Sequence, residues 1–155
     1  MASEKPHVRL YCDGACSPNP GTGGWGVVLI EDLHGLRKEL SGGARDTTNN
    51  VMELTAALRG LEALKVPCRV DVSTDSKYVQ QAFTQKWLDR WQANGWRTAD
   101  KQPVKNADLW RELVAAAAKH QVRWLWVRGH GNDVENNRAD QLAVEARLKL
   151  AGTAR

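Results

Sequence analysis

Four acidic residues, widely separated in the chain, could together form a metal site. Asp13 and Asp75 each follow a short apolar run, and Glu53 and Asp140 lie in segments with a helical pattern. Carboxylates repel one another, so four of them in one pocket require a cation. All-oxygen ligation favours Mg²⁺, with Mn²⁺ as a substitute. Two such ions, about 3.5–4 Å apart, suit in-line displacement at phosphorus.

Each acid also has a local explanation. Asp75 could cap a helix, and Asp13 could be the turn residue before Gly14. Glu53 and Asp140 could be acids favoured in the first turns of a helix by its dipole. Taken singly, the local roles suffice. Taken together, two acids at strand ends and two at helix starts favour a shared site, because the carboxyl ends of neighbouring parallel strands meet at one edge of a sheet.

The elements that must position these acids follow from periodicity. Residues 8–13 alternate as a strand, a Pro/Gly-rich turn covers 17–24, and strands at 25–31 and 36–41 complete a hairpin meander. The glycines of 21–24 lack the Lys-Ser/Thr that a phosphate-binding P-loop needs, so we expect a tight turn beside a bound strand.

The second half of the chain alternates helices and strands. Thr47, Thr48 and Asn49 offer N-cap chemistry for a helix to about residue 65, whose leucines recur at helical spacing. The following elements are a strand at 69–74, helices at 76–83, 86–93 and 107–120, a buried strand at 122–127 and a helix at 135–150. This order predicts an α/β fold with a five-stranded mixed sheet, an antiparallel meander plus two parallel strands, and helices on both faces.

Length and composition limit the class of protein. A chain of 155 residues, 42% hydrophobic and 26% charged, forms one globular domain, and we expect flexible ends at 1–7 and 151–155. No run spans a bilayer, and no apolar secretion signal is present, so we expect a cytoplasmic protein without membrane partners. Three cysteines without framework spacing indicate reduced thiols. A net charge of +4 is compatible with nucleic-acid binding and equally with a solvated surface.

Five motifs carry a resemblance to a known family. They are YCDGACSPNPGTGGWG (11–26), TTNNVMEL (47–54), VSTDSKYV (72–79), GWRTADKQPVKNADLW (95–110) and WVRGH with ENNRAD (126–140). Over residues 8–150 the chain resembles type 1 ribonuclease H, the bacterial family that cleaves the RNA strand of RNA–DNA hybrids. The resemblance implies a ribonuclease H-like fold, a monomer, two metal ions, and products with 5′-phosphate and 3′-hydroxyl ends.

The resemblance also implies roles for the acidic residues. Asp13 would bridge both ions, Asp140 would serve the ion that activates water, and Glu53 and Asp75 would serve the ion at the leaving oxygen. His130 matches a histidine on a mobile loop that helps proton transfer or product release, a task that suits an ordinary histidine pKa.

Glu135, at the far end of the same loop, would assist metal recruitment or product exit. Residues 131–134 depart from the family's commoner AGHPE-type loop, which bears on turnover.

The substrate contacts come from the resemblance as well. Residues expected along the minor groove, which would read the RNA strand, are Cys16, Asn19, Asn49, Asn50 and Lys77. Asparagine suits a 2′-hydroxyl because that group both donates and accepts, although turn and cap chemistry explains Asn19 and Asn49 equally well.

The DNA strand has its own expected contacts. A DNA phosphate would be held by Thr48 and Asn106. The expected substrate-binding handle, residues 86–106, contains Trp87, Trp91 and Trp96. Trp87 and Trp91 share one face of a helix, and one of this pair could instead belong to the core. At 92–94, the uncharged Gln-Ala-Asn stands where relatives often carry a basic cluster.

Two other functions compete with hybrid cleavage. A non-catalytic hybrid-binding module would keep the asparagines and tryptophans but would not need four acids. A related polynucleotidyl transferase, such as an integrase core, would lack the asparagine pair and the handle. The sequence therefore favours an endonuclease that binds RNA–DNA hybrids.

Overall fold

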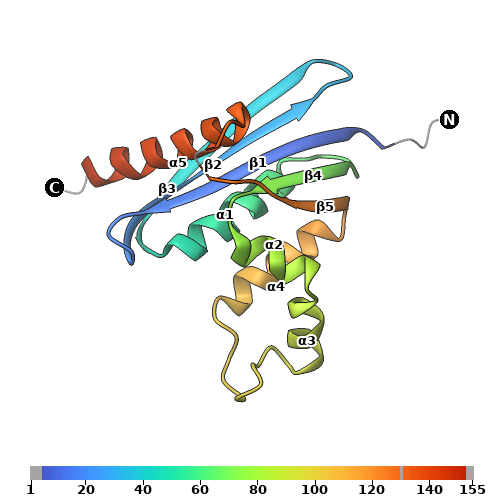
Figure 1. Cartoon of the computed structure of the whole chain (residues 1–155), viewed down its shortest axis with the longest axis vertical. Coiled ribbons are helices and arrows are strands. Elements are labelled where there is room, and N and C mark those ends of the chain that lie inside the picture. Colours follow the sequence, from blue (N-terminus) through green and yellow to red (C-terminus); the bar gives the residue numbers. More distant parts are fainter. Residues whose placement is uncertain (1–4, 130, 153–155) are drawn as a thin grey trace.

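A computed structural model describes residues 5–129 and 131–152 of the chain (Figure 1). A five-stranded sheet runs in the order β3-β2-β1-β4-β5, with the first two pairings antiparallel and the last two parallel. The predicted fold class is therefore confirmed. The strands and helices in chain order are β1 (His7–Cys16), β2 (Gly21–Glu31), β3 (Leu36–Thr47), α1 (Asn49–Glu62), β4 (Arg69–Thr74), α2 (Lys77–Thr84), α3 (Trp87–Ala93), α4 (Ala107–Ala117), β5 (Gln121–Trp126) and α5 (Val134–Gly152).

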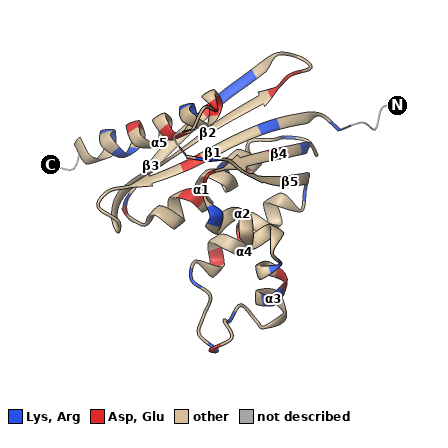
Figure 2. Cartoon of the chain, viewed as in Figure 1, with Lys and Arg blue, Asp and Glu red and all other residues tan. Residues whose placement is uncertain are grey.

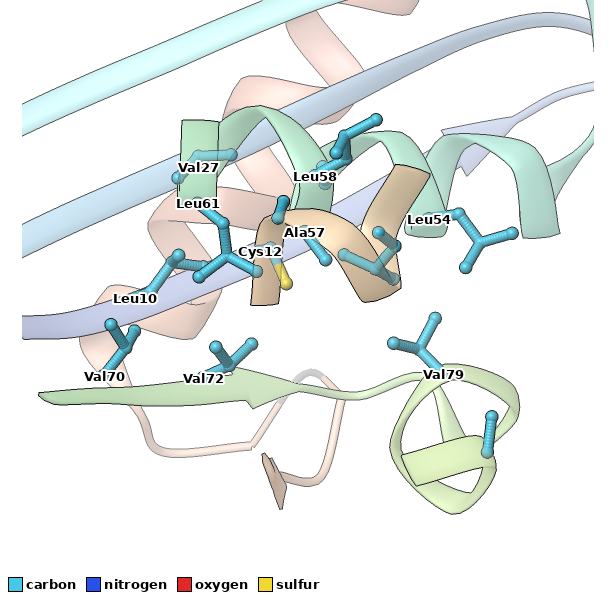
Figure 3. Close-up of a cluster of buried hydrophobic side chains, with 14 of the residues drawn as sticks. Leu10, Cys12, Val27, Leu54, Ala57, Leu58, Leu61, Val70, Val72 and Val79 are labelled. Carbon is cyan, nitrogen blue, oxygen red and sulfur yellow. The ribbon is translucent and has the colours of Figure 1, made fainter. Parts of the chain in front are cut away.

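Helices cover the two faces of the sheet unequally. On one face α1 packs against β1 and β2, and α4 packs against α1. The main core lies between α1 and the sheet and includes the buried side chains of Leu10, Leu58 and Val72 (Figure 3). On the other face α5 packs across β1, β2 and β3 (Figure 1). The α3 helix and the loop after it extend away from the sheet.

Three strand predictions are corrected by the structure. Residues 21–24, expected as a turn, lie inside β2, and β3 continues to Thr47 instead of ending near residue 41. The hydrogen-bonded ladder between β2 and β3 extends these strands through glycine-rich and polar sequence that has no apolar alternation. β5, expected to be buried, is a half-exposed edge strand because α5 covers only β1 to β3.

Glycines in β2 allow α5 to approach the sheet closely. A Cβ on Gly24 would lie 2.2 Å from the carbonyl oxygen of Ala143, and one on Gly26 would lie 2.4 Å from that of Ala139. Real Cβ atoms do not approach backbone so closely. These glycines therefore set the distance between β2 and α5, as glycine within a strand often marks a close backbone approach.

The first turn of α1 confirms the predicted capping. Thr48 is the N-cap, and its Oγ1 accepts a hydrogen bond from the backbone N–H of Val51 at 3.1 Å.

Of the predicted flexible ends, residues 1–4 and 153–155 lie outside the described residues, whereas His7 begins β1 and Gly152 ends α5. None of the helices in the described part combines the length and apolarity needed to cross a membrane.

Candidate active site

Three of the acidic residues meet where β1, β4 and α1 converge. The parallel pairing of β1 with β4 aligns Cys12 with Thr74, so Asp13 and Asp75 follow paired residues. Glu53 reaches them from the second turn of α1. Oxygen atoms of Asp13, Glu53 and Asp75 all lie within 4.8 Å of one another. Strand register and the start of α1 thus place three carboxylates in one site.

Gly14 holds α1 against this site. Its backbone N–H donates to Asp13 Oδ1 at 2.9 Å and also to Glu53 Oε1. A Cβ at Gly14 would lie 2.6 Å from the backbone nitrogen of Glu53 and from the carbonyl carbon of Met52. Glycine is therefore required here, and its N–H is shared by two of the acidic side chains.

Asp140 brings the fourth carboxylate from α5. Its side chain is half-buried and interacts with the carboxylate of Asp13, whose pKa is raised first by burial and further by the acidic neighbours, Asp140 among them. In the antiparallel register Asp13 lies opposite Gly26, whose missing side chain leaves room for Ala139, the residue before Asp140. The structure therefore brings Asp13, Glu53 and Asp75 into one group and places Asp140 beside Asp13.

The electrostatics of the cluster require a positive charge. Asp13 and Glu53 are 3% and 5% exposed. Figure 2 shows acidic positions on β1 and on α1, the elements that carry these two residues. Burial raises the pKa of Asp13, and the neighbouring Glu53 charge raises it further. Burial likewise raises the pKa of Glu53, with a further contribution from Asp75. Hard carboxylate oxygens at this spacing fit a divalent cation such as Mg²⁺ or Mn²⁺.

Comparison with known proteins shows which family shares this arrangement. The RNase H family model matches residues 5–147. A ribonuclease H from Bradyrhizobium diazoefficiens is 59% identical over 151 residues, covering 95% of this chain and 96% of that protein. The chain belongs to the ribonuclease H family. Ribonucleases H are endoribonucleases that act on RNA–DNA hybrids.

Other family members give a consistent result. A ribonuclease H from Moorella thermoacetica is 58% identical and covers 90% of each chain. Among solved structures, LC9-RNase H1, described as a type 1 RNase H with the type 2 active-site motif, superposes with a TM-score of 0.84 and 31% identity over 94% of this chain and 74% of that chain. LC11-RNase H1 in complex with RNA/DNA hybrid shares the fold, with a TM-score of 0.72 and 24% identity over 93% of this chain and 99% of that chain.

Several residues that the ribonuclease H resemblance assigns to the minor groove lie together beside α1. The backbone N–H of Asn49 donates to Asn19 Oδ1 at 3.0 Å. The thiol of Cys16 lies 3.5 Å from the carbonyl oxygen of Thr47, two residues before Asn49. Asn50, next along the chain, is exposed. The turn and cap roles considered above are thus present, and Asn50 lies open beside them.

A cluster of tryptophan side chains attaches the expected ribonuclease H handle to the core. The Trp91 ring lies 6.1 Å from Trp87, 6.4 Å from Trp96 and 5.6 Å from the fully buried Trp110, measured between ring centroids. Trp91 is at the centre of this cluster and contacts Trp110. Of the pair Trp87 and Trp91, it is therefore Trp91 that fits the core role that the sequence left open. Trp87 and Trp96 are half-buried at its margin.

The expected phosphate contact Asn106 has an unusual backbone. It precedes α4 with a φ of 62°, a left-handed conformation that asparagine tolerates better than most residues. Its side chain does not cap the helix. Instead, Asn106 Nδ2 donates to the hydroxyl of Tyr78 at 3.5 Å, and the same hydroxyl accepts from Trp110 Nε1 at 2.9 Å. The half-buried Tyr78, itself held by the buried Trp110, therefore contacts the side chain of Asn106.

The loop before α5 is only partly described. His130 lies outside the described residues. Glu135, in the first turn of α5, forms an ion pair with Arg37 of β3 at 2.7 Å. Arg37 also pairs with Glu39, which pairs in turn with Arg138 at 2.9 Å. These contacts attach the start of α5 to the sheet.

Four residues near the site were missed by the sequence reasoning. Gly26 sets the approach of α5, and Arg37 holds Glu135. Trp126 donates its indole N–H to the carbonyl oxygen of Asp75 at 3.0 Å, and a Cβ on Gly129 would lie 2.7 Å from Asp75 Oδ2. The alternating glycines of 24–26 carry a signal of close approach. The other contacts depend on tertiary neighbours that local sequence does not reveal.

Proposed function

We propose that this chain cleaves the RNA strand of RNA–DNA hybrids at a centre of two divalent ions, Mg²⁺ in the cell, held by the four gathered acids. The observation that carries the proposal is the convergence of Asp13, Glu53 and Asp75 within 4.8 Å, joined by Asp140. Bound ions would supply a nucleophile at neutral pH and stabilise charge on the phosphoryl oxygens. A hybrid-binding module would have no use for this buried, self-repelling cluster.

The residues around the centre would hold and orient the ligands. The Gly14 N–H fixes the carboxylates of Asp13 and Glu53, so both present oxygen atoms toward the same point. The ion pair of Glu135 with Arg37 fixes the first turn of α5, five residues before Asp140. We assign His130 to proton transfer or product release, in keeping with the family.

Strand selection would depend on both strands of the hybrid. The 2′-hydroxyl of the cut strand would meet Asn19, Asn49 and Asn50. The other strand would need deoxyribose and a phosphate near Asn106 and the handle. Because such contacts do not read base edges, cleavage should have little sequence preference.

The decisive experiment compares three duplexes of one sequence. An end-labelled RNA–DNA hybrid, duplex RNA and duplex DNA are incubated with the protein and Mg²⁺, with and without a chelator. We expect cleavage of the hybrid alone, abolished by the chelator and restored by added Mg²⁺ or Mn²⁺. The RNA products should carry 3′-hydroxyl ends that a polymerase extends. Binding without cleavage would support the hybrid-binding module, and strand joining would support a transferase.

A further inference from the structure

The indole of Trp126 lies between two residues of the active-site region. Trp126 ends β5, in register with Thr74 at the end of β4. Its Nε1–H crosses to the neighbouring chain segment and donates to the backbone carbonyl oxygen of Asp75 at 3.0 Å. The residue nevertheless remains 44% exposed, next to the buried carboxylates of Asp13 and Glu53.

A second contact uses the face of the same ring. The Nζ atom of Lys77, in the first turn of α2, lies over the indole of Trp126, 5.0 Å from its centroid. Asp75 and Lys77 flank Ser76, the N-cap of α2, whose Oγ accepts from the backbone N–H of Val79. One side chain from β5 therefore contacts both neighbours of the cap residue.

The chain segment after β5 also lies next to Asp75. The backbone N–H of Val127 donates to the carbonyl of Thr74 at 2.9 Å, which extends the strand pairing beyond Trp126. Two residues later, Gly129 passes so close that a Cβ there would lie 2.7 Å from Asp75 Oδ2. The backbone of Asp75 is thus fixed by Trp126, and its carboxylate is bordered by the segment that leads to His130.

We propose that Trp126 is a positioning residue: its indole N–H sets the backbone of the metal ligand Asp75, and its ring face orients the Lys77 ammonium toward substrate phosphate. This inference rests on the proposed function. A cation over an aromatic face keeps its charge available to an anion on its open side, and indole is the strongest such partner among the side chains. Trp126 thereby links metal binding to substrate binding.

A purely structural role for Trp126 makes a different prediction. If the indole only covered the edge of the sheet, its loss would lower stability without changing ligand affinities. Trp124 provides the matched control, since it lies on the same strand but its ring stacks on Phe83 at 4.0 Å, within the helix-covered core face. In the described part of the chain, the ring contact and the core packing of Trp124 involve hydrophobic residues.

The experiment separates the two contacts of the indole. Trp126→Phe removes the N–H and keeps an aromatic face, Trp126→Leu removes both, and Trp124→Phe is the control. Binding of Mn²⁺ alone is measured by calorimetry, Tm by thermal unfolding, and KM and kcat for a hybrid across metal and salt series. Incorporating 3-benzothienylalanine at position 126 removes only the N–H and serves if Trp126→Phe does not fold.

We expect Trp126→Phe to weaken Mn²⁺ binding by about two- to tenfold, the loss expected for one ordinary hydrogen bond. KM at saturating metal should stay unchanged. Trp126→Leu should in addition raise KM and flatten its salt dependence, as Lys77→Gln should. Trp124→Phe should change only Tm. The inference is overturned if Trp126→Phe and Trp124→Phe bind Mn²⁺ equally. Failure of the wild type to bind Mn²⁺ or cut hybrid would instead refute the proposed function.

Discussion

Replacing Gly26 by alanine tests how the sheet positions the fourth acidic residue. Gly26 lies opposite Asp13 in the sheet, and a Cβ there would meet the carbonyl oxygen of Ala139 at 2.4 Å and the Cβ of Leu142 at 2.7 Å. Both belong to α5, and Ala139 directly precedes Asp140. The added methyl group must therefore push this part of α5 away from Asp13.

The size of the shift follows from these distances. An ordinary contact between carbon and a non-bonded atom is about 3.5 Å, so the helix must retreat by roughly 1 Å near Ala139. Overpacking of this kind costs about 1–3 kcal/mol of unfolding free energy, which corresponds to a fall in Tm of roughly 2–12 °C for a chain of this size. A displacement of about 1 Å in a catalytic constellation can lower the rate by as much as ~10²-fold.

The assay follows kcat, the Mg²⁺ concentration for half-maximal cleavage, and Tm in three variants. Gly26→Ala should lower kcat and raise the Mg²⁺ requirement. Gly24→Ala makes a similar clash, 2.2 Å from the Ala143 oxygen, but farther along α5, so we expect comparable destabilisation with less loss of activity. Gly152→Ala adds a methyl group to open space at the end of α5 and should change nothing.

Two outcomes would contradict this role of Gly26. If Gly26→Ala lowered Tm but kept the wild-type kcat and Mg²⁺ requirement, the close approach of α5 would not be what positions Asp140. If Gly26→Ala changed neither Tm nor activity, the methyl group would have been accommodated without moving the helix.

Three other expectations can be measured directly. Asp13→Asn should nearly abolish cleavage while hybrid binding, followed by fluorescence anisotropy, survives; substantial Mg²⁺-supported cleavage would contradict its role. Replacing residues 92–94, all exposed, by Lys, Lys and Arg should tighten hybrid binding and steepen its salt dependence, by about 0.9 per added phosphate contact on B-DNA; an unchanged slope would mean that this segment does not touch the substrate. Hydrogen bonds from Arg138 and Arg37 lower the pKa of Glu39 from 4.5 to about 2. The ionised Glu39 therefore contributes its full stabilisation to the fold above about pH 4.5, and this stabilisation is lost as the pH falls toward 2. Glu39→Gln should therefore flatten the acid side of the stability curve in urea titrations between pH 5 and pH 3, and an equally steep curve would show that the ion pairs add no stability.

The parts of the site that the sequence predicted depend on local patterns. Asp13 and Asp75 each follow an apolar stretch, and each comes directly after the last paired residues of β1 and β4, although β1 itself continues to Cys16. Thr48 precedes a segment of regularly spaced leucines, so the start of α1, and with it Glu53, could be placed by cap chemistry. Residue types, period and caps therefore predicted the fold class and the meeting of the acidic residues.

The structural features that the sequence did not predict depend on contacts between residues that are far apart in the sequence. β5 reads as buried because its apolar residues resemble those of a central strand, yet α5 does not extend over it. The glycines at 21–24 predicted a turn. The close packing of α5 that requires Gly24 and Gly26 could not be foreseen, because α5 comes more than a hundred residues later in the chain. The hydrogen bond of Trp126 to a backbone carbonyl has no sequence signature at all.

The two edges of the sheet also affect how copies of the molecule behave toward one another. β3 and β5 each leave one row of backbone groups unpaired, and such rows can recruit a strand from another molecule. β3 carries Arg37, Lys38 and Glu39 in succession, and β5 is only six residues long, with Arg123 paired to Asp71 at 3.0 Å. The charged side chains of β3 and the short length of β5 both oppose the addition of a strand from another molecule. The ion pairs along β3 therefore also protect the folded enzyme against aggregation at high concentration.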